Sequence, residues 1–337
     1  MCGGNEAHYK FLMDWLAHMV QRPQEKPGTC VVLKGIEGAG KTILSHVMGL
    51  MLGSSALAVS QSKHILGNFN SHLEHNILLT AEEALWAGDK AGEGVQKELI
   101  TGKDITIERK GFDAYAAKSY TRLLMITNND WCAPAGAHSR RYFVLEVKSD
   151  KANKKDYFDP LYYEIENGCA EALLDELLRR DIESNLRYAP VTNALLGQRE
   201  QSLSNLERFF LEVARSAAIT KRDGSVVNLE KQSTEIMASD VWDAAKLRCG
   251  NDHGLYRTLG PLLADLGVTK TRPRILKKQI PHFAFPPYAE FAANVSEHLG
   301  VPVQDTNVIE GGNDECAENV PARARPASGA SASTVLH

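Results

Sequence analysis

The sequence predicts an α/β fold: a mostly parallel sheet covered by helices on both faces, then a helical segment and a small winged-helix-like domain. Three observations lead to this prediction. Short apolar runs alternate with helical or polar segments, which is typical of parallel sheets. A glycine-rich loop joins the first apolar run to an apolar helix, as in P-loop NTPases. Near the end, two helical patterns precede a basic hairpin, which is the order of a winged-helix module.

The composition is that of a cytoplasmic globular protein. Of the 337 residues, 43% are hydrophobic and 24% charged, enough for one sizeable core and a smaller second domain. No apolar run approaches the roughly 20 residues that span a membrane, and the start lacks a secretory signal profile. Six scattered cysteines indicate neither a zinc site nor a disulfide framework. Because the net charge is -4, any contact with nucleic acid must come from local basic patches.

The expected elements follow in order along the chain. A first helix is expected over Tyr9–Gln21, because apolar residues recur there at helical spacing before Pro23. Strands are expected at four apolar runs: Cys30–Leu33, Asn76–Thr80, Leu123–Thr127 and Tyr142–Val147. Helices should follow over 159–180, 203–218, 239–248 and 256–266.

These elements divide the chain into five regions. We expect an N-terminal helical lead-in (1–28), a P-loop core (29–150), a helical region that completes the core (151–236), a winged-helix-like domain (237–290) and a disordered tail (291–337). The tail is expected to be disordered because it is acidic and then low in complexity, with the stretch ARARPASGASAST.

The loop GIEGAGKT has the GxxxxGK[ST] pattern between a strand and a helix. In this pattern Gly35, Gly38 and Gly40 let backbone N–H groups wrap the β-phosphate, and the helix N-terminus adds its positive dipole. Lys41 would reach the β- and γ-phosphates, and Thr42 would supply a hydroxyl ligand to magnesium. We therefore predict ATP and Mg²⁺ as ligands; an accidental glycine-rich turn is the alternative.

Two further apolar runs end in polar residues that suit phosphate chemistry. NILLTAEE ends in two acids, which would lie at the carboxyl edge of the sheet, where phosphates bind. We assign Glu82 to the metal and Glu83 to the attacking water. LLMITNN ends in amides, and Asn128 is the expected sensor of the γ-phosphate or the water. The alternatives are an ordinary acidic helix start and ordinary turn chemistry.

The ordered motifs GIEGAGKT, NILLTAEEALWAGDK, KELITGKDITIERKGFDAY, RLLMITNNDW and SRRYFVLEV resemble the superfamily 3 helicase domain of phage and plasmid primase-helicase proteins, over roughly 9–285. The resemblance implies an AAA+-like core that forms a ring, usually a hexamer, and translocates on single-stranded DNA using ATP. Many relatives carry Asp-Glu where this chain has Glu82-Glu83. A primase or polymerase domain often precedes the helicase core in this family; for this chain we expect it to be a separate gene product, part of a split protein or missing from a fragment, and a primase or polymerase is an expected partner.

The resemblance adds two groups of residues. The segment from Lys97 to Tyr115 resembles the family's extra motif, whose hairpin grips the strand, and it makes Lys110, Arg109 and Lys97 the expected DNA contacts. The alternative is a surface hairpin, since the charges of this segment balance. Before the last strand, Arg141 is the expected finger that reaches the neighbouring subunit's γ-phosphate, with Arg140 as second choice.

A basic patch lies in the predicted hairpin of the winged-helix-like domain. Its five positive residues are Lys270, Arg272, Arg274, Lys277 and Lys278. They predict contact with duplex phosphates; a solvated loop or a subunit contact is the alternative.

The leading hypothesis for the whole chain is an ATP-dependent DNA helicase acting in replication of a phage or mobile element. The competing hypothesis is a nucleotide-dependent origin-binding or loading factor with weak ATPase activity. A P-loop kinase is disfavoured, because no arginine-rich lid is evident.

Overall fold

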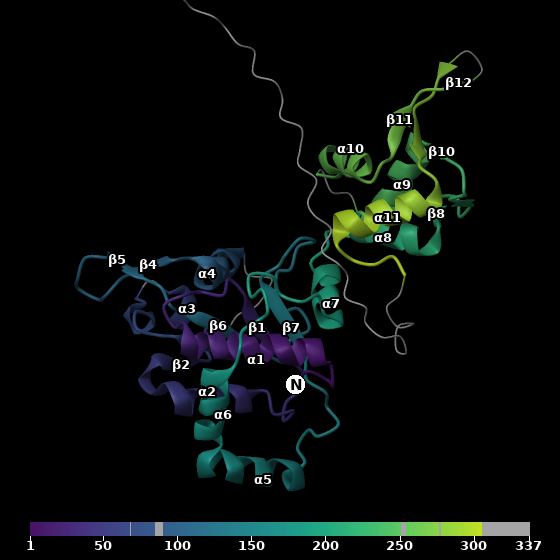
Figure 1. The fold of residues 1–337 in the computed structure, drawn as a ribbon. Helices are drawn as coiled ribbons and strands as arrows, with labels where there is room; N and C mark the ends of the chain where they lie inside the picture. Colours follow the sequence, from purple (N-terminus) through teal and green to yellow (C-terminus); the bar gives the residue numbers. More distant parts are fainter. Residues whose placement is uncertain (68, 85–89, 251–253, 276–277, 305–337) are drawn as a thin grey trace, which may run out of the picture. The chain divides into compact units, whose positions relative to one another are not determined.

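The computed structural model describes residues 1–67, 69–84, 90–250, 254–275 and 278–304 (Figure 1). Within this part of the chain, buried apolar side chains gather in two places. One surrounds a five-stranded sheet, and the other lies among the helices after residue 203. None of the described helices has the length and apolarity needed to cross a bilayer.

The five-stranded sheet is parallel throughout. Its members in spatial order are β2 (Ala56–Val59), β3 (Leu78–Glu82), β6 (Arg122–Thr127), β1 (Cys30–Lys34) and β7 (Tyr142–Glu146). Strand β6 therefore lies between β1 and β3, although it follows both in the chain. Ile126 pairs with Leu33 on one side and with Glu82 on the other. Because the strands are parallel, the loops after β1, β3 and β6 leave the same edge of the sheet.

Alternate residues of each strand enter opposite hydrophobic layers, as the two-residue period of a strand requires. Val31 and Leu33 of β1 face one layer, and Cys30 and Val32 face the other. The first layer is covered by α1 (Glu6–Gln21), α2 (Thr42–Leu52) and α6 (Ala170–Arg179). The second is covered by α3 (Lys63–Leu66), α4 (Lys90–Thr101) and α7 (Asn193–Gln201).

The remaining elements of the first part are short or peripheral. They are the 3-10 turns η1 (Gly53–Ser55) and η2 (Ser71–Leu73), the antiparallel strands β4 (Asp104–Ile107) and β5 (Tyr115–Lys118), α5 (Lys155–Glu164) and the π-helical turn η3 (Ile165–Cys169).

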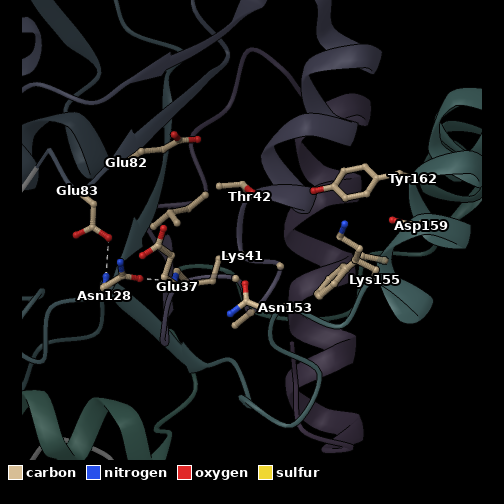
Figure 2. Close-up of a pocket in the computed structure, with 15 residues that line it drawn as sticks. Glu37, Lys41, Thr42, Glu82, Glu83, Asn128, Asn153, Lys155, Asp159 and Tyr162 are labelled. Carbon is tan, nitrogen blue, oxygen red and sulfur yellow. Dashed lines mark hydrogen bonds between the residues drawn. The ribbon is translucent and has the colours of Figure 1, made fainter.

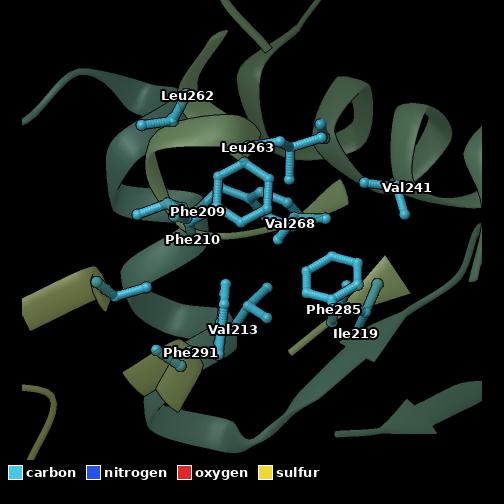
Figure 3. Packing of buried hydrophobic residues seen from close by; sticks show 14 of the residues in the cluster. Phe209, Phe210, Val213, Ile219, Val241, Leu262, Leu263, Val268, Phe285 and Phe291 are labelled. Carbon is cyan, nitrogen blue, oxygen red and sulfur yellow. The ribbon is translucent and has the colours of Figure 1, made fainter. Parts of the chain in front are cut away.

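The second core combines helices with a small antiparallel sheet. Its helices are α8 (Asn205–Ser216), α9 (Ala238–Cys249), α10 (Leu255–Asp265) and α11 (Tyr288–Leu299). The sheet has the order β10 (Thr234–Met237), β14 (His282–Phe285), β11 (Thr269–Thr271). Between β11 and β14 lie β12 (Arg274–Ile275) and β13 (Lys278–Gln279), and β8 (Ala218–Thr220) pairs with β9 (Val226–Asn228). Figure 3 shows Phe209, Phe210, Phe285 and Phe291 among the side chains that fill this core.

Several boundaries differ from the sequence prediction. The first helix begins at Glu6, because the Asn5 side chain accepts a hydrogen bond from the His8 N–H and caps it. Strand β3 runs to Glu82, so Glu83 is the first residue beyond it. The short strand β2, with the sequence ALAV, was missed because four small apolar residues show no distinctive periodicity.

The predicted regions at the end of the chain need two corrections. Residues 291–299 belong to α11, whose Phe291, Val295 and Leu299 are buried in the second core, so the prediction of disorder is wrong there. Helix α8 also contributes to the second core, although the prediction placed it in the region that completes the first. Residues 305–337 lie outside the described residues.

A buried arginine joins the first helix to the central strand β6. The guanidinium of Arg122 donates to the carbonyl oxygens of Arg22 at 2.8 Å and Glu25 at 2.6 Å, and to Nδ1 of His18 at 3.2 Å. Because Arg122 only donates, the ring nitrogen of His18 must accept and the ring is neutral. Burial, together with the charge of Arg122, lowers the pKa of His18 from 6.5 to about 4.

This arrangement predicts acid sensitivity. The unfolded chain binds a proton at His18 below pH 6.5 and the folded chain only below about pH 4, so stability falls as the pH drops through this window. For this group alone the loss is about 2 kcal/mol between pH 7 and pH 5. Urea unfolding of His18→Gln should lack this part of the pH dependence. The matched change His46→Gln, at an exposed position of α2, should retain it; equal slopes for both variants would contradict the assignment.

Candidate functional site

A cavity of about 600 Å³ opens at the carboxyl edge of the sheet, between the loop after β1 and helix α5 (Figure 2). It is lined by Glu37, Gly38, Ala39, Gly40, Lys41, Thr42, Glu82, Glu83, Ile126, Asn128, Asn153, Lys155, Phe158, Asp159 and Tyr162. The loop after β1, the end of β3 and the end of β6 all contribute, because β6 lies between the other two strands.

Two glycines of the loop are required by close approach of the segment after β7. Gly38 and Gly40 have φ values of +76° and +85°, where a side chain is strained. A Cβ on Gly38 would lie 2.1 Å from Oδ1 of Asn153, and one on Gly40 would lie 2.7 Å from the ring of Phe158. Gly35 directly follows β1. Gly38 and Gly40 therefore expose bare backbone toward the cavity, whereas Gly35 does not line it.

Lys41 is 6% exposed and its ammonium is held at the centre of the loop. It donates to the carbonyl oxygens of Gly35 at 2.7 Å and Ile36 at 2.8 Å, and to Oδ1 of Asn128 at 2.5 Å. Burial lowers the pKa of Lys41, while Glu83 and Glu37 act in the opposite direction. The loop thus holds the positively charged ammonium of Lys41 beside the residues at the ends of β3 and β6.

Glu83 has a strained backbone and is held by β6. Its φ of +53° lies in the left-handed region, which costs a non-glycine residue on the order of 1 kcal/mol or more. Its carboxylate accepts hydrogen bonds from the Asn128 N–H at 2.6 Å and from the Thr127 hydroxyl at 3.0 Å. Asn128 therefore contacts Lys41 through its side chain and Glu83 through its backbone, and the three predicted residues form one hydrogen-bonded chain.

The two residues predicted to bind metal both line the cavity. Glu82 ends β3, and Thr42 begins α2. Within the described residues neither side chain makes a hydrogen bond or an ion pair. One carboxylate and one hydroxyl fit Mg²⁺, which favours oxygen ligands and takes few from protein, the rest coming from phosphates and water.

The predicted hairpin forms, and the residues at the start of its turn are anchored. Residues 104–107 pair with 115–118, and the Asn70 side chain donates to the Thr106 carbonyl at 2.8 Å and accepts from the Glu108 N–H at 2.9 Å. Arg109 donates to the Glu74 carboxylate at 2.6 Å. Hydrogen bonds from Tyr115 and Arg109 lower the pKa of Glu74. This pairing commits Arg109 to holding the hairpin.

The three predicted DNA contacts therefore occupy different places. Lys110 is exposed next to Gly111 in the turn, and Phe112 beside them is 74% exposed. Lys97 lies on α4, outside the hairpin, and pairs with Glu93 one helical turn away. Of the three, Lys110 is the cation at the exposed turn.

Arg140 and Arg141 lie at the amino edge of the sheet, opposite the cavity. They precede β7, and the Cys30 N–H at the start of β1 donates to the Arg141 carbonyl at 2.8 Å. The loop after β1 lies a strand length away, roughly 13 Å, and neither arginine lines the cavity. Arg140 is exposed with its guanidinium 4.8 Å from the centre of the Tyr188 ring, and Arg141 is half-buried. Neither belongs to the cavity of the same chain.

Sequence reasoning missed the side of the cavity that α5 forms. Lys155, Phe158, Asp159 and Tyr162 all line it. The signal in the sequence was their spacing of three, four and seven residues, which places them on one face of a helix.

In the second core, the order of elements is α8, β10, α9, α10, β11, the β12–β13 hairpin and β14. Four predicted basic residues lie in or beside this hairpin and are exposed: Lys270, Arg272, Arg274 and Lys278. The fifth, Lys277, lies outside the described residues.

This chain is similar to known proteins at two levels, a family model and solved structures. Residues 33–141 match the family model described as DUF5906, a family of unknown function. No curated protein matches the chain. Among solved structures, the apo C-terminal region of NrS-1 (305–718) is 16% identical, with a TM-score of 0.62 over 82% of this chain and 71% of that one. The A form of the same region has a TM-score of 0.64 at 16% identity, over 84% and 72%. The chain shares the fold of the NrS-1 C-terminal region.

Proposed function

We propose that this chain is an ATP-dependent DNA helicase of the superfamily 3 type, which hydrolyses ATP to translocate on single-stranded DNA during replication of a phage or mobile element. The observation that carries the proposal is the hydrogen-bonded chain from Lys41 through Asn128 to Glu83 at one edge of a parallel sheet. The resemblance to superfamily 3 supports it, and the fold shared with the NrS-1 C-terminal region is compatible with it.

The proposed chemistry follows from the charges at the cavity. The backbone N–H groups of the loop and the Lys41 ammonium bind the β- and γ-phosphates. Glu83 orients the attacking water, and Asn128 holds both Lys41 and Glu83 in place. Thr42 and Glu82 would hold magnesium, which would supply charge neutralisation at the phosphates. Because Thr127 and Asn128 donate hydrogen bonds to the Glu83 carboxylate, its position is set in advance of the reaction.

The edge position of the arginines supports action between subunits. Arg141 and Arg140 lie too far from the cavity to serve it in the same subunit, so an arginine finger here must act on a neighbour. We therefore propose a ring, of the hexameric kind that the resemblance implies, with single-stranded DNA as the polymer it moves and a primase or polymerase as a partner. The C-terminal topology and its exposed basic hairpin fit a winged-helix domain that contacts duplex phosphates.

Two substitutions should separate binding from hydrolysis. Lys41→Ala removes the phosphate cation, so both ATP affinity and DNA-stimulated hydrolysis should be lost. Glu83→Gln keeps the shape of the side chain but not its charge; ATP binding should persist while turnover falls by at least about 100-fold. Phosphate release with and without single-stranded DNA measures both. Lys63→Ala, at an exposed position of α3, is the control, and full turnover by Glu83→Gln would exclude its role.

The hairpin should couple hydrolysis to the strand. Lys110→Ala should retain ATP hydrolysis without DNA but lose most strand displacement, because the exposed cation at the turn no longer grips a phosphate. The dependence of log affinity on log salt should become shallower by about 0.7, the value for one phosphate contact on a single strand. Lys103→Ala, exposed before β4, is the control. Unchanged displacement and an unchanged salt slope would remove the hairpin from the DNA path.

Mixing variants tests whether the finger acts between subunits. Lys41→Ala and Arg141→Ala should each be inactive alone. In an equal mixture, about one interface in four should pair an intact cavity with an intact finger, so hydrolysis should reappear. A mixture as inactive as its components, although a tag on only one of the two variants co-purifies the other and so shows that they assemble together, would contradict the role of Arg141. The same mixture with Arg140→Ala decides between the two arginines.

A further inference from the structure

Helix α5 presents one face to the cavity, and this face has no assigned role. Lys155, Phe158, Asp159 and Tyr162 line the cavity from successive turns. In Figure 2 the carboxylates of Glu82 and Glu83 lie on one side of Thr42, and the labelled side chains of α5 lie on the other. The cavity thus has an acidic side at the sheet and a mixed aromatic and polar side at the helix.

This helix has no buried residue and approaches the loop and α2 at a few positions. The Asn153 N–H donates to the Gly38 carbonyl at 3.2 Å, and the Phe158 ring is so close to Gly40 that a Cβ there would collide with it. Farther along, Leu161 and Ile165 pack with apolar residues of α2 in a small cluster of their own. The cavity-facing side chains therefore project from a helix rather than from a loop.

Three polar side chains on this face are available to bind a ligand. Lys155, Asp159 and Tyr162 are exposed, and within the described residues none of them makes a hydrogen bond or an ion pair. Lys155 and Asp159, four residues apart, do not pair with each other. By contrast, Tyr157, which does not line the cavity, has two aromatic contacts. Its ring meets Phe158 edge to face and lies under the ammonium of Lys151. A cation, an acid and an aromatic phenol are thus available together to a ligand in the cavity.

The order of the groups along the cavity indicates which part of a ligand would lie against α5. With the triphosphate on the loop, its γ end points to Lys41, Asn128 and Glu83, so the nucleoside must extend from the opposite end, past Thr42. That end faces α5. We propose that this face of α5 is the nucleoside subsite, an inference that rests on the proposed nucleotide function of the loop. It would take the nucleoside of a purine triphosphate, whose two-ring base offers the larger surface to an aromatic side chain.

Each side chain then has a distinct role. Tyr162, 42% exposed at the edge of the cavity, packs its ring on the base. Asp159 accepts a hydrogen bond from an amine or hydroxyl of the nucleoside, because a carboxylate can only accept. Lys155 neutralises the α-phosphate, which the loop's own lysine does not reach. Phe158 sets the distance between helix and loop.

Comparing ATP with inorganic tripolyphosphate tests the subsite, because tripolyphosphate has the phosphates and no nucleoside. Calorimetry with magnesium should show that Tyr162→Ala binds ATP roughly tenfold more weakly and binds tripolyphosphate as the native protein does. Asp159→Ala should show the same selective loss. Lys41→Ala should weaken both ligands. Tyr163→Ala is the matched control, since Tyr163 is the next residue, 67% exposed, and does not line the cavity.

The outcomes are distinguishable. If the native protein binds neither ligand, the proposed function of the loop fails and the subsite fails with it. If it binds both, but Tyr162→Ala and Asp159→Ala leave the ATP affinity unchanged, the loop remains a phosphate site and the nucleoside subsite is overturned. Equal weakening of both ligands by Tyr162→Ala would assign the helix a supporting role for the loop and would also overturn the proposal. Thermal melts of all four variants show whether each is folded.

Discussion

The site depends on the position of Asn128 between Lys41 and Glu83. Its side-chain oxygen accepts from the lysine ammonium, and its backbone N–H donates to the glutamate carboxylate. Both contacts exist because β6 is inserted between β1 and β3, so that its last residues lie between the ends of its two neighbours. A strand order in which β1 and β3 were adjacent would bring the loop and the acids together without this intervening amide. The sheet topology thus determines the charge arrangement of the cavity.

The same parallel sheet separates two groups of residues with different tasks. The glycine-rich loop, Lys41, Glu82 and Glu83 lie at the carboxyl edge, whereas Arg140 and Arg141 lie at the amino edge. Because the length of β1 separates the two edges, the proposed role of these arginines at such a site requires a second copy of the chain. The asymmetry of the sheet is what makes an assembly of subunits part of the proposed function. The exposed turn at Lys110 has a separate anchor in Asn70 and Glu74.

Most of the central site could be predicted from the sequence, because strand ends carry strong local signals. The loop pattern located Lys41 and Thr42, and polar residues after apolar runs located Glu82, Glu83 and Asn128. Side-chain partners could not be predicted in this way. Nothing in the local sequence shows that Arg109 is occupied by Glu74, which lies 35 residues earlier, or that Lys97 is paired on a helix. The side of the cavity formed by α5 was missed because α5 follows the last strand of the sheet. Only tertiary packing, which the local sequence does not show, places its residues beside the cavity.

The most direct test of the account is a structure of the protein with magnesium, a non-hydrolysable ATP analogue and a DNA fork. The account predicts that the Lys41 ammonium leaves the carbonyls of Gly35 and Ile36 and contacts the β- and γ-phosphates, with Asn128 and Glu83 at the γ end. A nucleotide bound elsewhere, with Lys41 still bonded to those carbonyls, would contradict the account.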